Sequence, residues 1–526
     1  MSLLKKRSAC CIPIIFITFA VAKLAVFWLN TKFTPHNLII DELKYRIREA
    51  FGHVPTVEQE RGIDLFSLFL ADHMPECVMV LRGSAGTGKT TLAGAVVKGM
   101  LALKQKLVLM APTGRAAKVF SLYAGHPAYT IHRRIYRLRS SVDLPSFGQS
   151  SGSFASLAPN LYTDTLFIID EASMISSNTL GDFFSSSSLL DDLIRYVYSG
   201  HNCRMLLIGD TAQLPPVGEE EAPALMSDVL RGYGLKVYEC NLNEVLRQSQ
   251  KSGILYNATL IRQMITHDDL TQLPRIRVQG FPDVVVVPGD ELIESLASSY
   301  SRVGVDDTIV VTRSNKRANV YNEGIRRTVL DREDELCRGD QLMIVKNNYR
   351  SLPSVTAEES PSDGDISGLS FLANGDRCVV QRVRNLRELY GFRFADVTLQ
   401  LPDYNDYELT TVALLSTLTT EAPALTREQQ EQLYTSVLAD YADIPYKADR
   451  MKKLKTDPYY NALQVKFGYA VTCHKAQGGQ WAHVYIDQGY MTDDMLTPDY
   501  IHWLYTALTR ATERVFLVNW PNTQIQ

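Results

Sequence analysis

The sequence of 526 residues predicts an α/β protein with two domains, each built on a parallel sheet. Short apolar runs recur along the chain, and each run ends in a polar or glycine-rich turn. Helical patterns separate the runs, which is typical of βα units whose strands pair in parallel. Because such sheets bind ligands beyond the carboxyl ends of their strands, we expect the functional residues directly after the runs.

The composition is that of a globular chain, with 45% hydrophobic and 21% charged residues, and it excludes fibrous and wholly disordered classes. The net charge of -4 gives no general affinity for polyanions, so a nucleic-acid site would have to be a locally basic cleft. The eight cysteines form no CxxC pairs, which argues against structural zinc and disulfide frameworks. We therefore expect a cytoplasmic protein.

The N-terminal residues 1–33 stand apart from this pattern. Residues 10–28 are apolar except for Lys23 and follow a basic segment, which is the pattern of a signal anchor or transmembrane helix. That topology would carry the remaining chain across the membrane, away from ATP. Three interpretations stay open: a dispensable segment or start-site artefact, a membrane-associated tail, and a buried helix.

The first predicted strand, Val78 to Leu81, leads into the phosphate-binding sequence GSAGTGKT at residues 83–90. Glycines allow the backbone N–H groups to surround phosphates, Lys89 supplies a positive charge, and the Thr90 hydroxyl can bind Mg²⁺. The helix predicted after this loop favours anions at its N-terminus. This segment predicts a site for a nucleoside triphosphate with Mg²⁺.

The next predicted strands are Leu107 to Met110, Leu166 to Ile169, Met205 to Ile208 and Val237 to Tyr238. Each of the first three leads into polar residues.

Pro112, Thr113 and Arg115 follow the first of these strands, at a helix start that suits a sugar-phosphate backbone. Asp170 and Glu171 follow the strand Leu166 to Ile169. The Asp170 carboxylate would hold Mg²⁺, and the Glu171 carboxylate would polarise the attacking water. Gln213 follows the third in a proline-rich loop, which is either a sensor of the γ-phosphate or a rigid turn.

A second sheet is predicted from Thr308 to Val311, Val484 to Ile486 and Val515 to Val518. Between the first and second of these runs, Arg377 to Val383 and Phe392 to Leu401 alternate like antiparallel strands, which indicates a small β module inserted in the second domain.

These motifs occur together with four others in a fixed order. The others are Thr130-Ile131-His132, Glu244 to Gln248, Tyr469 to Gly479 and Trp503 to Ala511. From about Pro55 to Val518 the chain resembles the superfamily 1B DNA helicases, and most of all their RecD/Dda type. Residues 1–33 lie outside the resemblance.

The motifs and the resemblance together imply the site residues. The residues expected to bind the nucleotide are Gln59, Gly83, Gly86, Thr87, Gly88, Lys89, Thr90, Thr91 and Gly478. The residues expected to bind Mg²⁺ are Thr90 and Asp170. The residues expected to act in catalysis are Lys89, Glu171, Gln213, Arg247 and Arg510. The two arginines would act as arginine fingers on the γ-phosphate. DNA binding falls to Pro112, Thr113, Arg115, His132, Thr472, His474 and Lys475. Surface ion pairs for the arginines and core or capping roles for the histidines are the alternatives.

The resemblance also implies an architecture of two RecA-like P-loop motor domains with parallel sheets, a pin insertion and an SH3-like β insertion. The first motor domain is expected at residues 34–250 with the pin at 133–163, and the second at 251–345 and 461–526, with the β insertion at 346–460. Phe147 or Phe154 could form the tip of the pin, or be ordinary packed aromatics.

The function implied is an ATP- and Mg²⁺-dependent helicase that moves 5'-to-3' on single-stranded DNA as a monomeric motor. It would unwind duplex at single-strand to double-strand junctions during DNA repair, recombination or replication. The alternatives are a helicase of the same superfamily that acts on RNA, and a membrane-tethered DNA-binding ATPase that does not unwind.

Overall fold

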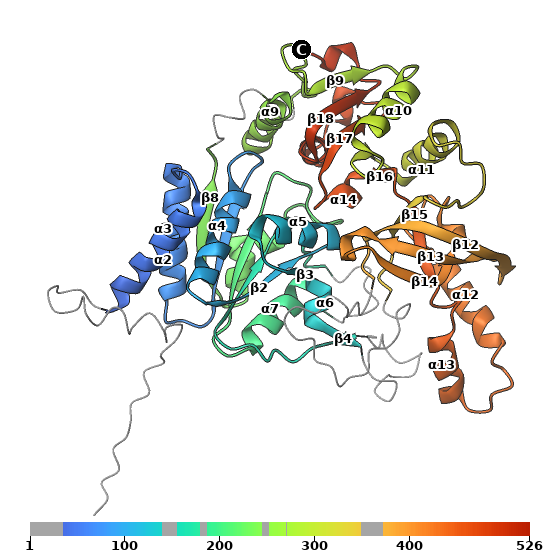
Figure 1. Cartoon of the computed structure of the whole chain (residues 1–526), viewed down its shortest axis with the longest axis horizontal. Helices are drawn as coiled ribbons and strands as arrows, with labels where there is room; N and C mark the ends of the chain where they lie inside the picture. The colour runs from blue at the N-terminus through green and yellow to red at the C-terminus, as the bar shows by residue number, and fades with distance from the viewer. Residues whose placement is uncertain (1–34, 139–154, 179–186, 245–251, 270, 349–371) are drawn as a thin grey trace, which may run out of the picture.

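The computed structural model describes residues 35–138, 155–178, 187–244, 252–269, 271–348 and 372–526. Two parallel sheets and one closed barrel organise these residues (Figure 1). The mixed α/β class with two parallel sheets is confirmed, and the barrel fits the expected SH3-like insertion.

The first sheet has the strand order β3-β2-β6-β7-β1-β8, and all neighbours are parallel. Its strands are β1 (Cys77–Gly83), β2 (Lys106–Ala111), β3 (Ala128–Thr130), β6 (Thr165–Ile169), β7 (Arg204–Gly209) and β8 (Lys236–Leu242). Every apolar run predicted for this region lies within one of these strands.

Helices cover both faces of the first sheet and form two separate cores. One core includes residues of α2 (Pro35–Phe51), α3 (Val57–Ala71), α4 (Lys89–Ala102) and α5 (Gly114–Ala124). The other includes residues of α6 (Ile131–Ile135), α7 (Leu189–Ser199) and α8 (Ser227–Gly232). A sheet covered on both faces explains why its strands read as continuous apolar runs rather than alternating ones.

The second sheet has the order β16-β10-β17-β18-β9, again with parallel neighbours. Its strands are β9 (Val284–Val287), β10 (Thr308–Thr312), β16 (Ala470–Thr472), β17 (Trp481–Asp487) and β18 (Ala511–Val518). Its helices are α9 (Gly253–His267), α10 (Leu292–Val303), α11 (Asn315–Gly324), α14 (Cys473–Ala476) and α15 (Pro498–Leu508).

The barrel closes through β11 (Gln341–Ile344), β12 (Arg377–Leu389), β13 (Phe392–Leu401), β14 (Tyr407–Leu414) and β15 (Leu463–Phe467). Only the β14–β15 pair is parallel. The barrel shares one apolar core with the second sheet, so the two are packed together. Helices α12 (Arg427–Ala439) and α13 (Lys447–Thr456) project from the barrel, away from both sheets (Figure 1).

The segment predicted to carry the pin begins and ends as a two-stranded antiparallel ribbon of β4 (Tyr136–Leu138) and β5 (Ala155–Leu157). Phe147 and Phe154 lie outside the described residues.

The apolar run at 10–28 also lies outside the described residues. Among the helices that the structure does describe, none combines the length and the apolar character that a membrane span requires.

Candidate functional site

The phosphate-binding loop joins β1 to α4 in a shape that depends on its glycines. Gly86 and Gly88 adopt φ angles of +79° and +77°, a left-handed conformation that favours glycine. The Thr87 hydroxyl donates to the Ser84 carbonyl at 2.8 Å, and a Cβ at Gly83 would lie 2.8 Å from the same hydroxyl. The loop therefore has the backbone shape that the predicted phosphate site needs, and Lys89, Thr90 and Thr91 open α4. Phosphate binding itself stays a prediction.

Gln59 supports this loop from behind. It is fully buried, and its side-chain amide donates to the Thr87 carbonyl at 3.1 Å. Its side-chain oxygen accepts from the Thr56 N–H at 2.9 Å, in a capping box that starts α3. The structure therefore places Gln59 beside the phosphate loop, while its role toward adenine stays a prediction.

Asp170 and Glu171 lie at the carboxyl end of β6, where the sequence places them. Burial and the nearby Glu171 raise the pKa of Asp170, and the charge of Lys89 opposes that rise. The Tyr123 hydroxyl donates to one oxygen of Asp170, and the Glu171 N–H donates to the other at 2.9 Å. Glu171 has a positive φ of 52°, and its Oε2 is buried with no hydrogen-bond partner among the described residues.

This donor set fits a nucleotide with Mg²⁺. The loop offers N–H groups and a lysine to phosphates, while the Thr90 hydroxyl and the Asp170 carboxylate are oxygen ligands of the kind Mg²⁺ prefers. The unpartnered oxygen of Glu171 leaves an acceptor for a water molecule. When bound, Mg²⁺ would neutralise charge that develops on the phosphates during hydrolysis.

The loop after β7 contacts the second domain. The Leu214 N–H donates to the Thr506 hydroxyl at 2.8 Å, and the Leu214 carbonyl accepts from the Gln477 amide at 2.6 Å. Gln213, the residue before Leu214, is buried, and its side-chain oxygen has no hydrogen-bond partner in the described part of the chain. This loop therefore joins the two domains.

Arg510 lies just beyond α15 and is only 3% exposed. Its guanidinium donates to the carbonyls of Thr506 at 3.0 Å and Gly479 at 3.3 Å, both in its own domain. The other predicted arginine finger, Arg247, lies outside the described residues. The action of either arginine on the γ-phosphate stays a prediction.

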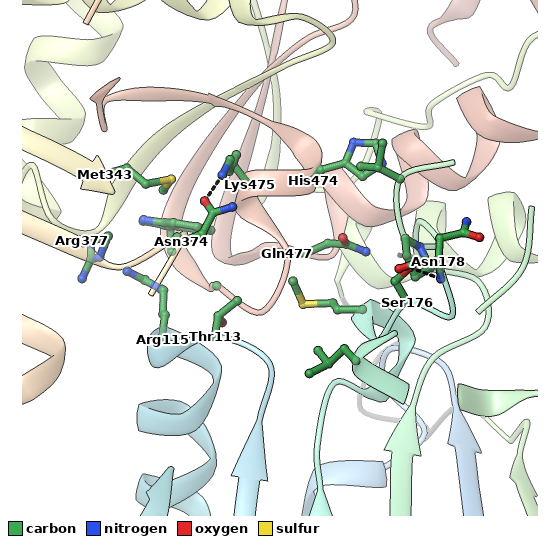
Figure 2. A pocket seen from close by; sticks show the side chains of 17 residues that line it. Thr113, Arg115, Ser176, Asn178, Met343, Asn374, Arg377, His474, Lys475 and Gln477 are labelled. Atoms are coloured by element: carbon green, nitrogen blue, oxygen red, sulfur yellow. Dashed lines mark hydrogen bonds between the residues drawn. The ribbon is translucent and has the colours of Figure 1, made fainter. Parts of the chain in front are cut away.

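A cavity of about 430 Å³ lies where the two domains and the barrel meet (Figure 2). Four of the residues predicted to bind DNA line it, and they come from both domains: Thr113, Arg115, His474 and Lys475. Thr113 also caps α5, because its hydroxyl accepts from the Ala116 N–H at 3.2 Å. The structure thus brings together residues that are about 360 positions apart in the chain.

The lining of this cavity is cationic. It contains Arg115, Arg377 and Lys475, and no carboxylate occurs among the described residues that line it. Burial, together with the like charge of Lys466, lowers the pKa of Lys475 to about 8, and its ammonium donates to the side chain of Asn374 (Figure 2). The Arg115 guanidinium stacks 4.2 Å from the centre of the Trp481 ring. The cavity is therefore locally basic, which is what a nucleic-acid site in a chain of net charge -4 would require.

The remaining residues predicted to bind DNA do not line the cavity. Pro112 precedes Thr113, Thr472 ends β16 just before α14, and His132 lies in α6 with its ring 5.7 Å from that of Tyr136. Gly478, predicted at the nucleotide, lies beside Thr113: a Cβ there would approach the Thr113 hydroxyl at 3.1 Å. Its role toward the nucleotide stays a prediction.

Sequence reasoning missed several polar residues of the cavity. The barrel supplies Asn374 and Arg377, and the first domain supplies Asn178. None of them belongs to a motif with a recognisable spacing. The positive charge of Arg377 is the one feature of the three that suggests DNA binding, and it does not distinguish Arg377 from the many other arginines of the chain.

Two family models match the chain in regions that contain these sites. An AAA domain model matches residues 71–274, and a UvrD-like helicase C-terminal domain model matches residues 467–518. The first match includes the phosphate loop and the carboxylates after β6, and the second includes His474, Lys475 and Arg510.

Similar proteins include two helicases. The chain is 36% identical over 181 residues to the ATP-dependent RecD2 DNA helicase of Deinococcus radiodurans, a match that spans 34% of the chain and 21% of that protein. It is 23% identical to the ATP-dependent DNA helicase Dda of Enterobacteria phage T4, over 84% of the chain and 94% of that protein. One similar solved structure is that of Pif1 helicase from Bacteroides in complex with ADP-AlF3 and single-stranded DNA. The match spans 90% of this chain and 94% of that one, at 14% sequence identity and a TM-score of 0.42.

Proposed function

We propose that this chain, an ATP-driven DNA helicase of the superfamily 1B RecD/Dda type, moves 5'-to-3' along single-stranded DNA and separates the duplex ahead of it. Its work would lie in DNA repair, recombination or replication. The motor would act as a monomer, with residues 34–250 as one motor domain, 251–345 with 461–526 as the other, and 346–460 as the β insertion.

The observation that carries this proposal is the cationic cavity at the junction of both domains and the barrel. A single strand of DNA is a flexible polyanion, and cationic side chains that face one groove hold its phosphates. Because Arg115 and Lys475 come from different domains, a change in domain separation would change their spacing along the strand. That is what a translocating motor requires.

The nucleotide site supplies the change in separation. Lys89 and the loop amides would hold the phosphates on the first domain, and Glu171 would orient the attacking water. Arg510 on the second domain would approach the same phosphates from the other side, and Arg247 would act with it. Binding of ATP therefore favours a closed pair of domains, and hydrolysis releases it.

The experiment measures ATPase activity and strand separation on duplexes with a 5' tail, a 3' tail or no tail, in DNA and RNA forms. We expect ATP turnover that DNA stimulates and unwinding only of the 5'-tailed DNA duplex. Lys89→Ala should abolish both activities, because the phosphates lose their main fixed charge. Unwinding that survives in Lys89→Ala would contradict the proposal.

Two results would favour the alternatives. Preferential unwinding of the RNA duplex would make RNA the track. DNA binding and ATP turnover without strand separation on any duplex would indicate a DNA-binding ATPase. Repeating the assays with residues 1–33 removed tests whether that segment is dispensable.

A further inference from the structure

Tyr505 joins the phosphate-binding loop to the loop after β7. It lies in α15 of the second domain, and its hydroxyl accepts a hydrogen bond from the Ala85 N–H at 2.9 Å. The same hydroxyl donates to the Asp210 carboxylate at 2.7 Å. One side chain of the second domain therefore connects two loops of the first.

The side chains of Tyr505 and Asp210 are closed to solvent. Tyr505 is 1% exposed and Asp210 is 2% exposed. Ala85 packs against the apolar core of the second domain, the core that also contains Ala212 and Leu214. Burial raises the pKa of Asp210, whereas the charge of Lys89 and the hydrogen bond from Tyr505 lower it. The Ala212 N–H also donates to Asp210 at 2.9 Å, so the Tyr505 hydroxyl is one of three groups, with Lys89 and this amide, that favour the ionised carboxylate.

Neighbouring residues of α15 hold the same loop, but through its backbone. Thr506 accepts from the Leu214 N–H at 2.8 Å, and the His502 ring nitrogen lies 3.0 Å from the Ala212 carbonyl. Tyr505 differs because it also bonds an amide of the phosphate loop, whose N–H groups are the ones that face phosphates.

We propose that Tyr505 is a positioning residue that transmits the state of the nucleotide between the domains. Its hydroxyl fixes the Ala85 amide relative to the Asp210 carboxylate when the domains meet, so that closure also sets the position of Gln213, three residues further on. The inference deepens the proposed function and depends on it. It assigns no contact between Tyr505 and the reacting atoms.

The test compares Tyr505→Phe with Tyr500→Phe in the full-length protein. Phenylalanine keeps the buried ring and removes only the hydroxyl. Tyr500 is a matched control, since it lies in the same helix, is 1% exposed, and donates to the Gln488 side chain at 2.5 Å, within the second domain. The measurements are kcat and KM for ATP with saturating single-stranded DNA, the affinity for that DNA, and the melting temperature.

We expect Tyr505→Phe to lower the DNA-stimulated kcat about tenfold, the scale for losing a hydrogen bond to a buried charged group. The KM for ATP and the affinity for DNA should stay within about threefold, because Lys89 and the cavity are intact. Tyr500→Phe should behave like the wild type. A kcat within about twofold of the wild type in Tyr505→Phe would overturn the proposal, as would equal losses in both variants.

A second comparison separates this role from a general loss of packing. Asp210→Asn alone and combined with Tyr505→Phe forms a double-mutant cycle. If the Tyr505 hydroxyl and the Asp210 carboxylate act through the same interaction, the double variant should be about as slow as the slower single variant. Independent, multiplying losses would contradict the proposal. A wild-type protein without DNA-stimulated ATP turnover would instead contradict the proposed function itself.

Discussion

Asp170 receives a hydrogen bond from a helix that begins at the cationic cavity. Its partner, the Tyr123 hydroxyl, lies near the C-terminal end of α5, while Thr113 and Arg115 lie at the N-terminal end. The hydrogen bond lowers the pKa of Asp170 against the rise that burial causes. Tyr123 therefore favours the charged form of a carboxylate that we expect to bind Mg²⁺.

We expect Tyr123→Phe to raise the Mg²⁺ concentration for half-maximal ATPase activity about tenfold, because a ligand loses the group that orients it and keeps it ionised. The fold should remain, since the ring stays in place. The measurement is a Mg²⁺ titration of ATP turnover.

Tyr198→Phe is the control for this titration. Tyr198 lies in the first domain and donates to the Cys77 carbonyl at 2.8 Å, not to a carboxylate of the site. The same Mg²⁺ requirement in Tyr123→Phe and the wild type would show that the hydroxyl does not support the metal site.

Residues with local signatures could be predicted from the sequence, and their tertiary partners could not. Asp170 and Glu171 directly follow an apolar run, and Lys89 ends the glycine-rich loop after another, so the topology of the sheet determines their location. Tyr123 and Tyr505 carry no motif signal that names their partners. Their hydroxyls bond Asp170 and Asp210, which are 47 and 295 positions away.

At the scale of elements, α5 serves both as part of the first core and as one wall of the cavity. Near its middle the helix also contacts the segment that follows barrel strand β13, where the Lys118 ammonium donates to the Pro402 carbonyl at 2.7 Å. The capping residue Thr113 therefore has two effects to separate: it stabilises the helix start and it faces the cavity.

Thr113→Ala should lower the local stability of α5 by about 1 kcal/mol, because an N-cap hydroxyl is lost. It should also weaken DNA binding. Hydrogen exchange of the α5 amides measures the first effect, and titration with labelled single-stranded DNA measures the second.

Thr426→Ala provides the comparison. Thr426 caps α12 on the barrel, where its hydroxyl accepts from the Gln429 N–H at 3.3 Å. It should speed exchange in α12 by a similar amount and leave DNA affinity unchanged. If both variants bind DNA as the wild type does, Thr113 acts only as a cap.

The predicted strands of the first sheet were confirmed because buried parallel strands give continuous apolar runs. The barrel was predicted less completely. Its strands β11 and β15 are only four and five residues long, and they lie on either side of the predicted insertion at 346–460. Their pairing brings together residues more than 100 positions apart, such as Leu342 and Phe467, and short segments carry no local signal for such a register.

At the scale of the whole molecule, a chain of net charge -4 carries a cavity without carboxylates among its described lining residues. In the proposed DNA-binding role, attraction of the strand must therefore come from few cations, and each should have a measurable effect. Lys475 is the most informative of them, because its pKa of about 8 lies within an accessible range.

The sign of the pH effect follows from this lowered pKa. Below about pH 8 the Lys475 ammonium is charged and attracts phosphate. Above about pH 8 the free protein increasingly carries a neutral amine. Part of the free energy of DNA binding is then used to protonate that amine, which weakens binding. Between about pH 7 and about pH 9 the dissociation constant for single-stranded DNA should therefore rise, by roughly fivefold if one charge-assisted contact becomes a neutral one.

Lys475→Arg should abolish most of that rise, because a guanidinium remains charged over this range. Lys475→Ala should bind more weakly at both pH values and lower the slope of log affinity against log salt by about 0.7, the value for one phosphate contact on a single strand. Lys453→Arg in α13, which lies outside the cavity, should keep the wild-type pH dependence. The measurement is fluorescence anisotropy of labelled DNA at several salt concentrations for each pH. A pH dependence that persists in Lys475→Arg would assign the titrating charge to another residue and remove Lys475 from the proposed DNA track.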